Sequence, residues 1–213
     1  MHVEADTIPD AWHDSLRAFV YQTDLVRYDS MRGPCSEVQD ALIRIRRPLA
    51  APMISEHYPG ELRSLVDGYA AGFLNHPDVQ GSTVSERLYA WGRHTRGGAG
   101  IDQVARAEAA LRNEPESRFT ILTFWDPAVD PGLENPVSPL VASLRVRDGA
   151  LGSTLTARSV DAWLGAFPML IGFASLVGEV AARLELEPGP ATYLFLSYHL
   201  YDVDLPVVRG LVA

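Results

Sequence analysis

Residues 158–184 read RSVDAWLGAFPMLIGFASLVGEVAARL, and this stretch decides the fold. Its apolar run over residues 162–178 is slightly too short to span a bilayer comfortably, and it contains one proline and three glycines. A buried helix of a globular protein explains this composition better than a membrane span does. We therefore predict a long, buried central helix over residues 160–186 and no contact with a membrane.

Strand and shorter helix patterns surround this central helix. Alternating or β-rich composition predicts strands at residues 38–45, 118–125, 140–146, 151–156 and 192–200. The third and fourth of these flank Asp148-Gly149, a dipeptide typical of a two-residue hairpin turn. Apolar residues at helical spacing predict further helices over 11–27, 61–74 and 101–113. This order predicts one α+β domain over residues 1–213, with a mixed or antiparallel sheet.

Composition and charge restrict the class of protein. The chain has 213 residues, of which 47% are hydrophobic, so it can form a sizeable core. A formal net charge of −9 argues against binding nucleic acid polymers or anionic membranes, although a few converging arginines can still bind a small anion. Residues 1–10 show no signal peptide, and the single cysteine, Cys35, excludes an internal disulfide framework. These features predict a cytoplasmic protein.

Two pairs of residues could bind a ligand. Arg158 and Ser159 would suit a phosphate if a helix begins just after them, because a guanidinium, a hydroxyl and free N–H groups would then point at one anion. The alternative for Arg158 is an ordinary solvated surface charge. His199 and Tyr201 share one face of their predicted strand. From the residues alone, the favoured interpretation of that pair is a core edge whose polar tips reach water.

Other chemistries have little support in the sequence. No glycines flank Ser138 in the manner of a nucleophile elbow. The histidines lack metal-ligand spacing, and the chain contains no HExxH, Walker A or GxGxxG motif. We therefore expect no bound metal, no nucleoside-triphosphatase activity and no Rossmann dehydrogenase.

Several segments together resemble the thymidylate synthase and pyrimidine-nucleotide hydroxymethylase family. RSVDAWLG (158–165) and SYHLYDVDL (197–205) resemble its QRSxDxFLG and GDxHxYxNH signatures. Upstream, LYAWGR (88–93), the segment 101–118 and FWDP (124–127) resemble its YGxQWR, DQ…SRR and AWNP elements. Because these motifs keep their order, the resemblance predicts the thymidylate-synthase-like fold, a single domain with an α+β architecture.

The resemblance also implies roles for individual residues. Those implied to bind the nucleotide phosphate are Arg32, Arg158, Ser159 and, from the second subunit of a homodimer, Arg118. His199 and Tyr201 would hydrogen-bond the sugar, and Asp161 would face the folate or pyrimidine end of the pocket. Asp67 is the counterpart of the family's general acid–base glutamate. The implied one-carbon donor is methylenetetrahydrofolate.

The sequence departs from the family at positions that carry its chemistry. Ser138 stands in the place of the nucleophilic cysteine, and a serine alkoxide forms much less readily near neutral pH than a thiolate. Met169 stands in the place of the asparagine that reads the pyrimidine edge, which predicts an altered or apolar base pocket. Phe119 replaces the second arginine of the SRR pair. The chain also ends at Ala213 without the segment that closes over folate, which argues against standard thymidylate synthesis.

Two hypotheses about function stay open. The first is a diverged methyl or hydroxymethyl transferase, or a tailoring enzyme of specialised metabolism, that acts on a pyrimidine nucleotide or a related metabolite. The retained Arg158, Ser159, His199 and Tyr201 favour it. The second is a noncatalytic nucleotide-binding homologue or partner subunit, which the departures favour.

Overall fold

A computed structural model describes residues 1–30, 32–74, 83–93 and 100–213. Its strands are β1 (His2–Ala5), β2 (Val26–Ser30), β3 (Gly33–Ile45), β4 (Ile121–Thr123), β5 (Pro139–Arg147), β6 (Ala150–Ala157), β7 (Val160–Asp161) and β8 (Glu187–Tyr201). Its α-helices are α1 (Ile8–Val20), α2 (Arg63–Phe73), α3 (Thr83–Tyr89), α5 (Gln103–Asn113), α6 (Ala166–Arg183) and α7 (Leu205–Val212). Two 3₁₀ turns, Gly60–Leu62 and Asp130–Gly132, complete the described elements.

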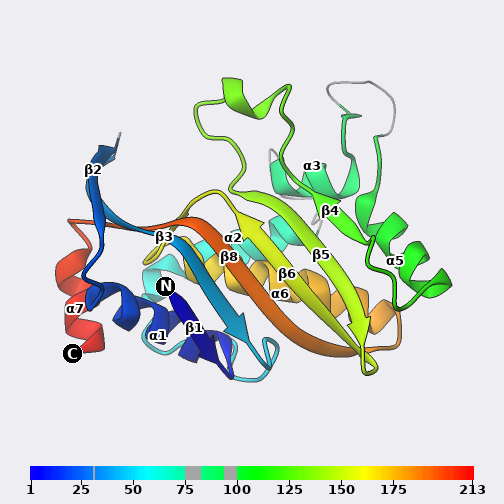
Figure 1. Ribbon diagram of the computed structural model, residues 1–213, viewed down its shortest axis with the longest axis horizontal. Coiled ribbons are helices and arrows are strands. Elements are labelled where there is room, and N and C mark those ends of the chain that lie inside the picture. The colour runs from blue at the N-terminus through cyan, green and yellow to red at the C-terminus, as the bar shows by residue number, and fades with distance from the viewer. Residues whose placement is uncertain (31, 75–82, 94–99) are drawn as a thin grey trace.

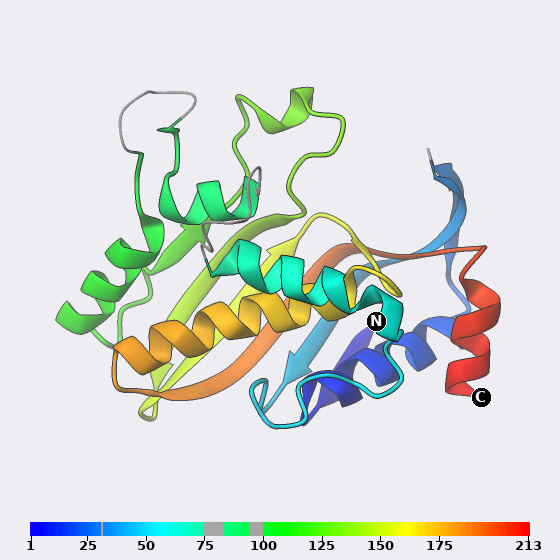
Figure 2. The same cartoon turned by 180° about the vertical axis from the view of Figure 1, so that it is seen from behind.

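One mixed sheet takes strands from both ends of the chain. Its order is β1-β3-β8-β6-β5-β4, with β2 added to β3 and β7 added to β8. The central strand β8 runs antiparallel to β3 and parallel to β6. Helices α2 and α6 cross behind the sheet in Figure 1 and in front of it in Figure 2. This arrangement confirms the predicted α+β class with a mixed sheet.

Helix α6 is the predicted central helix, and its apolar composition serves the core. It is the one described helix that is long and apolar enough to cross a bilayer, and 72% of it is buried inside the protein. The helix begins at Ala166, so the predicted start at residue 160 is wrong. Val160 and Asp161 instead form β7, because they pair with Tyr198 and His199 of β8.

Close contact between α2 and α6 brings a second helix near the end of β8. A Cβ atom at Gly172 of α6 would lie 2.7 Å from Cδ2 of Phe73 and 3.0 Å from the carbonyl oxygen of Tyr69. Glycine is therefore required for this approach. The contact fixes the position of Tyr69, which matters below.

Other element boundaries test the sequence prediction. The β5–β6 hairpin is confirmed, and both turn residues, Asp148 and Gly149, have the positive φ that a type I′ turn needs. The helix predicted over 11–27 spans Ile8–Val20, and the last two residues of the predicted range belong to β2. Of residues 118–125, three form the strand β4. Strand β8 begins earlier than predicted. Its two prolines, Pro188 and Pro190, have no backbone N–H to donate, and they are tolerated because the pairing of β8 with β3 begins only at Ala191.

Candidate functional site

The candidate site lies where β8 changes the face that it presents to the core. Phe195 is buried, and so is Tyr198, whose hydroxyl shares a 2.7 Å hydrogen bond with Ser15 of α1. These two core residues are three positions apart, so the two-residue alternation of a strand is broken between them. His199 and Tyr201 consequently share the other face, with their ring centroids 5.3 Å apart. The prediction that they lie together is confirmed.

His199 and Ser159 are the centre of the site. Ser159 Oγ lies 3.2 Å from His199 Nδ1 in hydrogen-bonding geometry. Burial lowers the pKa of His199, the carboxylates of Asp161 and Glu37 oppose that shift, and the positive charges of Arg32 and Arg158 reinforce it. The imidazole is therefore neutral at pH 7. Arg32 and Arg158 therefore lie close enough to this imidazole for their charges to act on it.

Arg158 is held from behind by the segment that precedes β5. Its Nε donates to the carbonyl of Val137 (3.0 Å) and its Nη2 to the carbonyl of Pro136 (2.8 Å). Its backbone N–H donates to the carbonyl of Ser138 (2.9 Å). Ser138 Oγ in turn donates to the backbone carbonyl of Ser159. Pro136, Val137 and Ser138 thus form a cradle, the 136–138 cradle, for Arg158 and Ser159.

Asp161 caps a turn before α6. Its Oδ1 accepts hydrogen bonds from the backbone N–H groups of Trp163 (2.9 Å) and Leu164 (3.0 Å). The sequence prediction of free helix N–H groups directly after Ser159 is therefore wrong, since β7 and this turn separate Ser159 from α6. The N-terminus of α6 therefore does not directly follow Arg158 and Ser159.

Three residues near Asp161 were not among the predicted site residues. Burial raises the pKa of Tyr58 to about 12, and its hydroxyl donates to the carbonyl of Leu164 (3.3 Å). Burial followed by the charge of Asp161 raises the pKa of both Tyr69 and Asp204. No local motif marks Tyr58 or Tyr69, because their approach to Asp161 depends on tertiary packing, and Asp204 lies within the family-like segment 197–205 but was assigned no role. A lone tyrosine on the apolar face of the predicted 61–74 helix was the one available signal.

The structure leaves two predicted residues apart from this cluster. Asp67 is exposed on α2, and it is two positions from Tyr69, so about 200° of helical rotation separates their side chains. Arg118 is exposed close to Glu116, whose carbonyl accepts from Nη1 of Arg147 at the far end of β5. Ser138 precedes the near end of β5, so about 27 Å of strand lies between Arg118 and the 136–138 cradle.

Two further positions are buried. Met169 lies in α6 with no exposed surface, so the predicted apolar base pocket stays a prediction. Cys35 is also fully buried, and its Sγ donates to the carbonyl of Tyr28 at 3.7 Å. Among the described residues, no group of three or more histidine, cysteine or acidic side chains could hold a metal ion.

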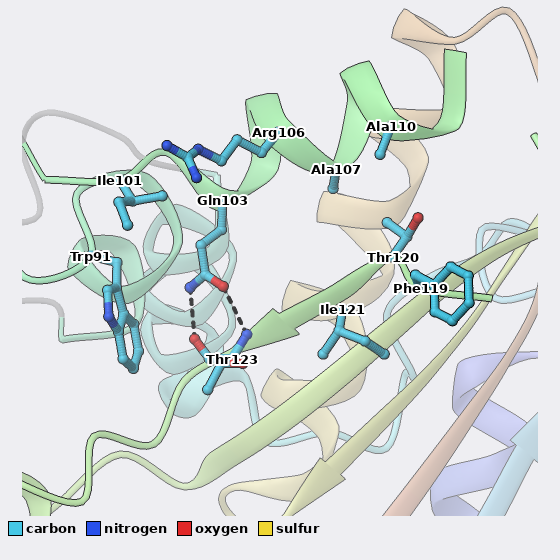
Figure 3. Close-up of a pocket in the computed structure, with 10 residues that line it drawn as sticks. All are labelled: Trp91, Ile101, Gln103, Arg106, Ala107, Ala110, Phe119, Thr120, Ile121 and Thr123. Carbon is cyan, nitrogen blue, oxygen red and sulfur yellow. Dashed lines mark hydrogen bonds between the residues drawn. The ribbon is translucent and has the colours of Figure 1, made fainter. Parts of the chain in front are cut away.

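A separate concavity lies between α5 and β4 (Figure 3). This α5–β4 hollow has a volume of about 470 Å³, and Trp91, Ile101, Phe119 and Ile121 supply its apolar walls. Gln103 crosses it: Nε2 donates to the carbonyl of Thr123 (2.7 Å), and Oε1 accepts from the N–H of Thr123 (2.9 Å). None of the predicted site residues lines it.

Comparison with known proteins points to one family. The thymidylate synthase family profile matches residues 73–213. A protein of Methanothermobacter marburgensis named "Putative thymidylate synthase" is 27% identical over 99% of this chain and 97% of its own length. Two further proteins of the same name are also similar. The one from Methanosarcina barkeri is 28% identical over 99% of this chain and 94% of its own length, and the one from Methanopyrus kandleri is 27% identical over 96% of this chain and 94% of its own length.

Proposed function

Because the chain belongs to the thymidylate synthase family, we propose that it binds a pyrimidine nucleotide or a related phosphorylated metabolite and transfers a one-carbon unit to it. The observation that carries this proposal is the convergence of Arg158, Ser159 and His199, with Arg32 near the same imidazole. Guanidinium and hydroxyl donors suit a phosphate. A neutral imidazole beside the phenol of Tyr201 suits the hydroxyl groups of a sugar.

We propose further that the reaction is not standard thymidylate synthesis. A thiolate is the nucleophile that adds readily to a pyrimidine ring, and the family's cysteine position holds Ser138 here. The hydroxyl of Ser138 donates to a backbone carbonyl, whereas an activated serine donates its proton to a base. The thiol of Cys35 is buried in β3. These facts favour a methyl or hydroxymethyl transferase, or a tailoring enzyme, with altered chemistry.

Methylenetetrahydrofolate is the family's usual donor, and we propose it as the donor here. When bound, it supplies the one-carbon unit. Asp161 fits it, because Oδ1 is engaged by two backbone N–H groups and no hydrogen bond from the described residues reaches Oδ2, which can accept from the ring N–H and amino groups of a pterin. Tyr58 and Tyr69 lie close enough to Asp161 for its charge to raise the pKa of each phenol. We propose no metal.

The second candidate function is a noncatalytic nucleotide-binding homologue or partner subunit. The engaged hydroxyl of Ser138 favours it, since such a site can bind a nucleotide without an activated nucleophile.

One experiment separates these functions. Purified protein is titrated calorimetrically with dUMP, dCMP, UMP and CMP, and each mixture is then incubated with isotopically labelled methylenetetrahydrofolate and examined by mass spectrometry. We expect binding of at least one nucleotide and transfer of the label to it. Binding without labelled product would identify the noncatalytic function. Binding of none of the four nucleotides would contradict both.

We also propose that the protein is a cytoplasmic homodimer, folded as one domain. The face of β3, β8, β6 and β5 turned to the viewer in Figure 1 has no described helix across it. Exposed apolar side chains lie toward its edge at Phe119, Ile121 and Val141. Arg118 lies too far from Arg158 to serve the same subunit, and a partner would bring it within reach. Light scattering after gel filtration would contradict the dimer if it measured a mass near 23.3 kDa.

A further inference from the structure

The two residues that carry the phosphate-binding proposal lie in a short link without regular structure. Arg158 and Ser159 connect the end of β6 at Ala157 to the two-residue strand β7. Neither residue takes part in the strand pairing of β6 or β7. Their positions therefore depend on contacts from elsewhere in the fold.

The 136–138 cradle supplies those contacts. Three of its four hydrogen bonds end on the backbone carbonyls of Pro136, Val137 and Ser138, and all three come from Arg158. The fourth is different, because the hydroxyl of Ser138 donates to the carbonyl of Ser159. It is the one bond in the cradle that depends on the side chain at position 138.

The bond to Ser159 connects the cradle to the imidazole. The Oγ of Ser159 shares a hydrogen bond with His199 Nδ1, so a movement of the Ser159 backbone would change that contact. A serine hydroxyl has a single O–H to donate, and that of Ser138 donates to the backbone carbonyl of Ser159. A carbonyl cannot accept the proton permanently, so this geometry does not activate an oxygen nucleophile.

We propose that Ser138 is a positioning residue: its hydroxyl holds Ser159, and with it Arg158 and His199, in the arrangement that binds a phosphate. The position that holds a reactive thiolate in the family thus serves here to shape the anion site. This role rests on the proposed function for its ligand, and it differs from the catalytic role that the resemblance implies.

The test compares Ser138→Ala, Ser138→Thr and Ser138→Cys with the wild type and with Ser143→Ala, which changes a partly buried serine of β5, the strand that follows Ser138. The nucleotide is whichever of the four binds the wild type. Loss of one hydrogen bond predicts about fivefold weaker binding by Ser138→Ala, with Ser138→Thr and Ser143→Ala within about twofold of the wild type. Ser138→Cys should resemble the alanine variant, because a thiol is a weak donor.

A ligand-free measurement keeps the two proposals separate. The ring ¹H–¹⁵N signals of His199 report its contact with Ser159, and we expect them to shift in Ser138→Ala but not in Ser138→Thr or Ser143→Ala. Shifted signals in a protein whose wild type binds no nucleotide would support the positioning role and contradict the proposed function. If the alanine variant does not fold, Ser138→Cys carries both measurements.

Two results would overturn the positioning role. One is unchanged His199 signals together with wild-type affinity in Ser138→Ala and Ser138→Cys. The other is a Ser138→Ala variant that binds the nucleotide with wild-type affinity in the calorimetric titration but loses all turnover, because that pattern identifies a nucleophile.

Discussion

The α5–β4 hollow and the site around Arg158 are built in opposite ways. In the hollow, the amide of Gln103 is satisfied at both ends, because Nε2 also donates to the carbonyl of Arg87 at 2.7 Å. At Arg158, two backbone carbonyls hold the guanidinium from behind, while Ser159 and His199 share a hydrogen bond that a ligand can rearrange. The hollow has apolar walls and the amide of Gln103 is committed to the fold, although the buried Oγ1 of Thr120 on its lining has no hydrogen-bond partner among the described residues. The comparison teaches that available donors indicate a ligand site better than concavity does.

The largest expected effect concerns the ion pairs behind the hollow. Arg87 is buried, lies 3.1 Å from Asp130 and 3.5 Å from Asp126, and its guanidinium stacks on the ring of Trp91. We expect Arg87→Met to lower the free energy of unfolding by about 3–5 kcal/mol, because it leaves buried carboxylates without a counter-charge. Denaturant unfolding measures this.

The matched control is Arg183→Met. That arginine pairs with Glu108 and Glu179 but is 43% exposed, so its loss should cost less than about 1 kcal/mol. If the two variants lose similar stability, the ion pairs of Arg87 are not structural. Nucleotide affinity of Arg87→Met at a temperature where it is folded should stay within about twofold of the wild type.

The next largest effect is on binding. Arg158→Ala removes the one cation that the 136–138 cradle fixes, and we expect about 100-fold weaker binding of the nucleotide, since charge-assisted hydrogen bonds to phosphate are strong. Arg17→Ala, on the exposed side of α1, should bind as the wild type does. Calorimetric titration measures the nucleotide affinity of both variants. Equal affinities in the two variants would place the phosphate elsewhere.

A smaller effect concerns acid stability. An unfolded histidine titrates near pH 6.5, and burial lowers the pKa of His199 in the folded protein. Below about pH 6.5 this histidine is therefore protonated in the unfolded chain but stays neutral in the folded protein. The difference lowers the free energy of unfolding by up to about 1.4 kcal/mol per pH unit. His199→Asn should lose less stability on acidification, whereas exposed His57→Asn should follow the wild type. Parallel unfolding curves for His199→Asn and wild type between pH 7 and 5.5 would contradict this.

Some of the molecule was predictable from the sequence because its signals are local. The β5–β6 hairpin follows from Asp148-Gly149 between alternating segments, and α5 follows from its apolar spacing. The short strands β1 and β2 carry no comparable pattern, and they exist because β3 pairs with both. The start of α6 was misplaced because hydrophobicity alone does not show that residues 160–161 pair with β8.

The site was less predictable than the fold. Strand alternation predicted that His199 lies beside Tyr201, but a common site for Arg32 and Arg158 was implied only by a family resemblance. Gly172 lets α2 approach α6, which brings Tyr69 close enough to Asp161 for its charge to raise the pKa of the phenol, and no spacing rule predicts this approach. The bond from Ser138 to Ser159 joins residues 21 positions apart and likewise needs the folded sheet.

The smallest expected effect returns to the hollow. Arg106 is the cation on its rim, and its side chain is exposed on α5 (Figure 3). If the hollow bound the nucleotide, this arginine would meet the phosphate, and Arg106→Ala would weaken binding as strongly as Arg158→Ala does. We expect a change within about twofold, and an effect on unfolding below about 0.5 kcal/mol, because the substitution removes a solvated charge from the rim of a hollow whose central amide, that of Gln103, is already paired. A tenfold loss of affinity would reverse the comparison and make the hollow the binding site.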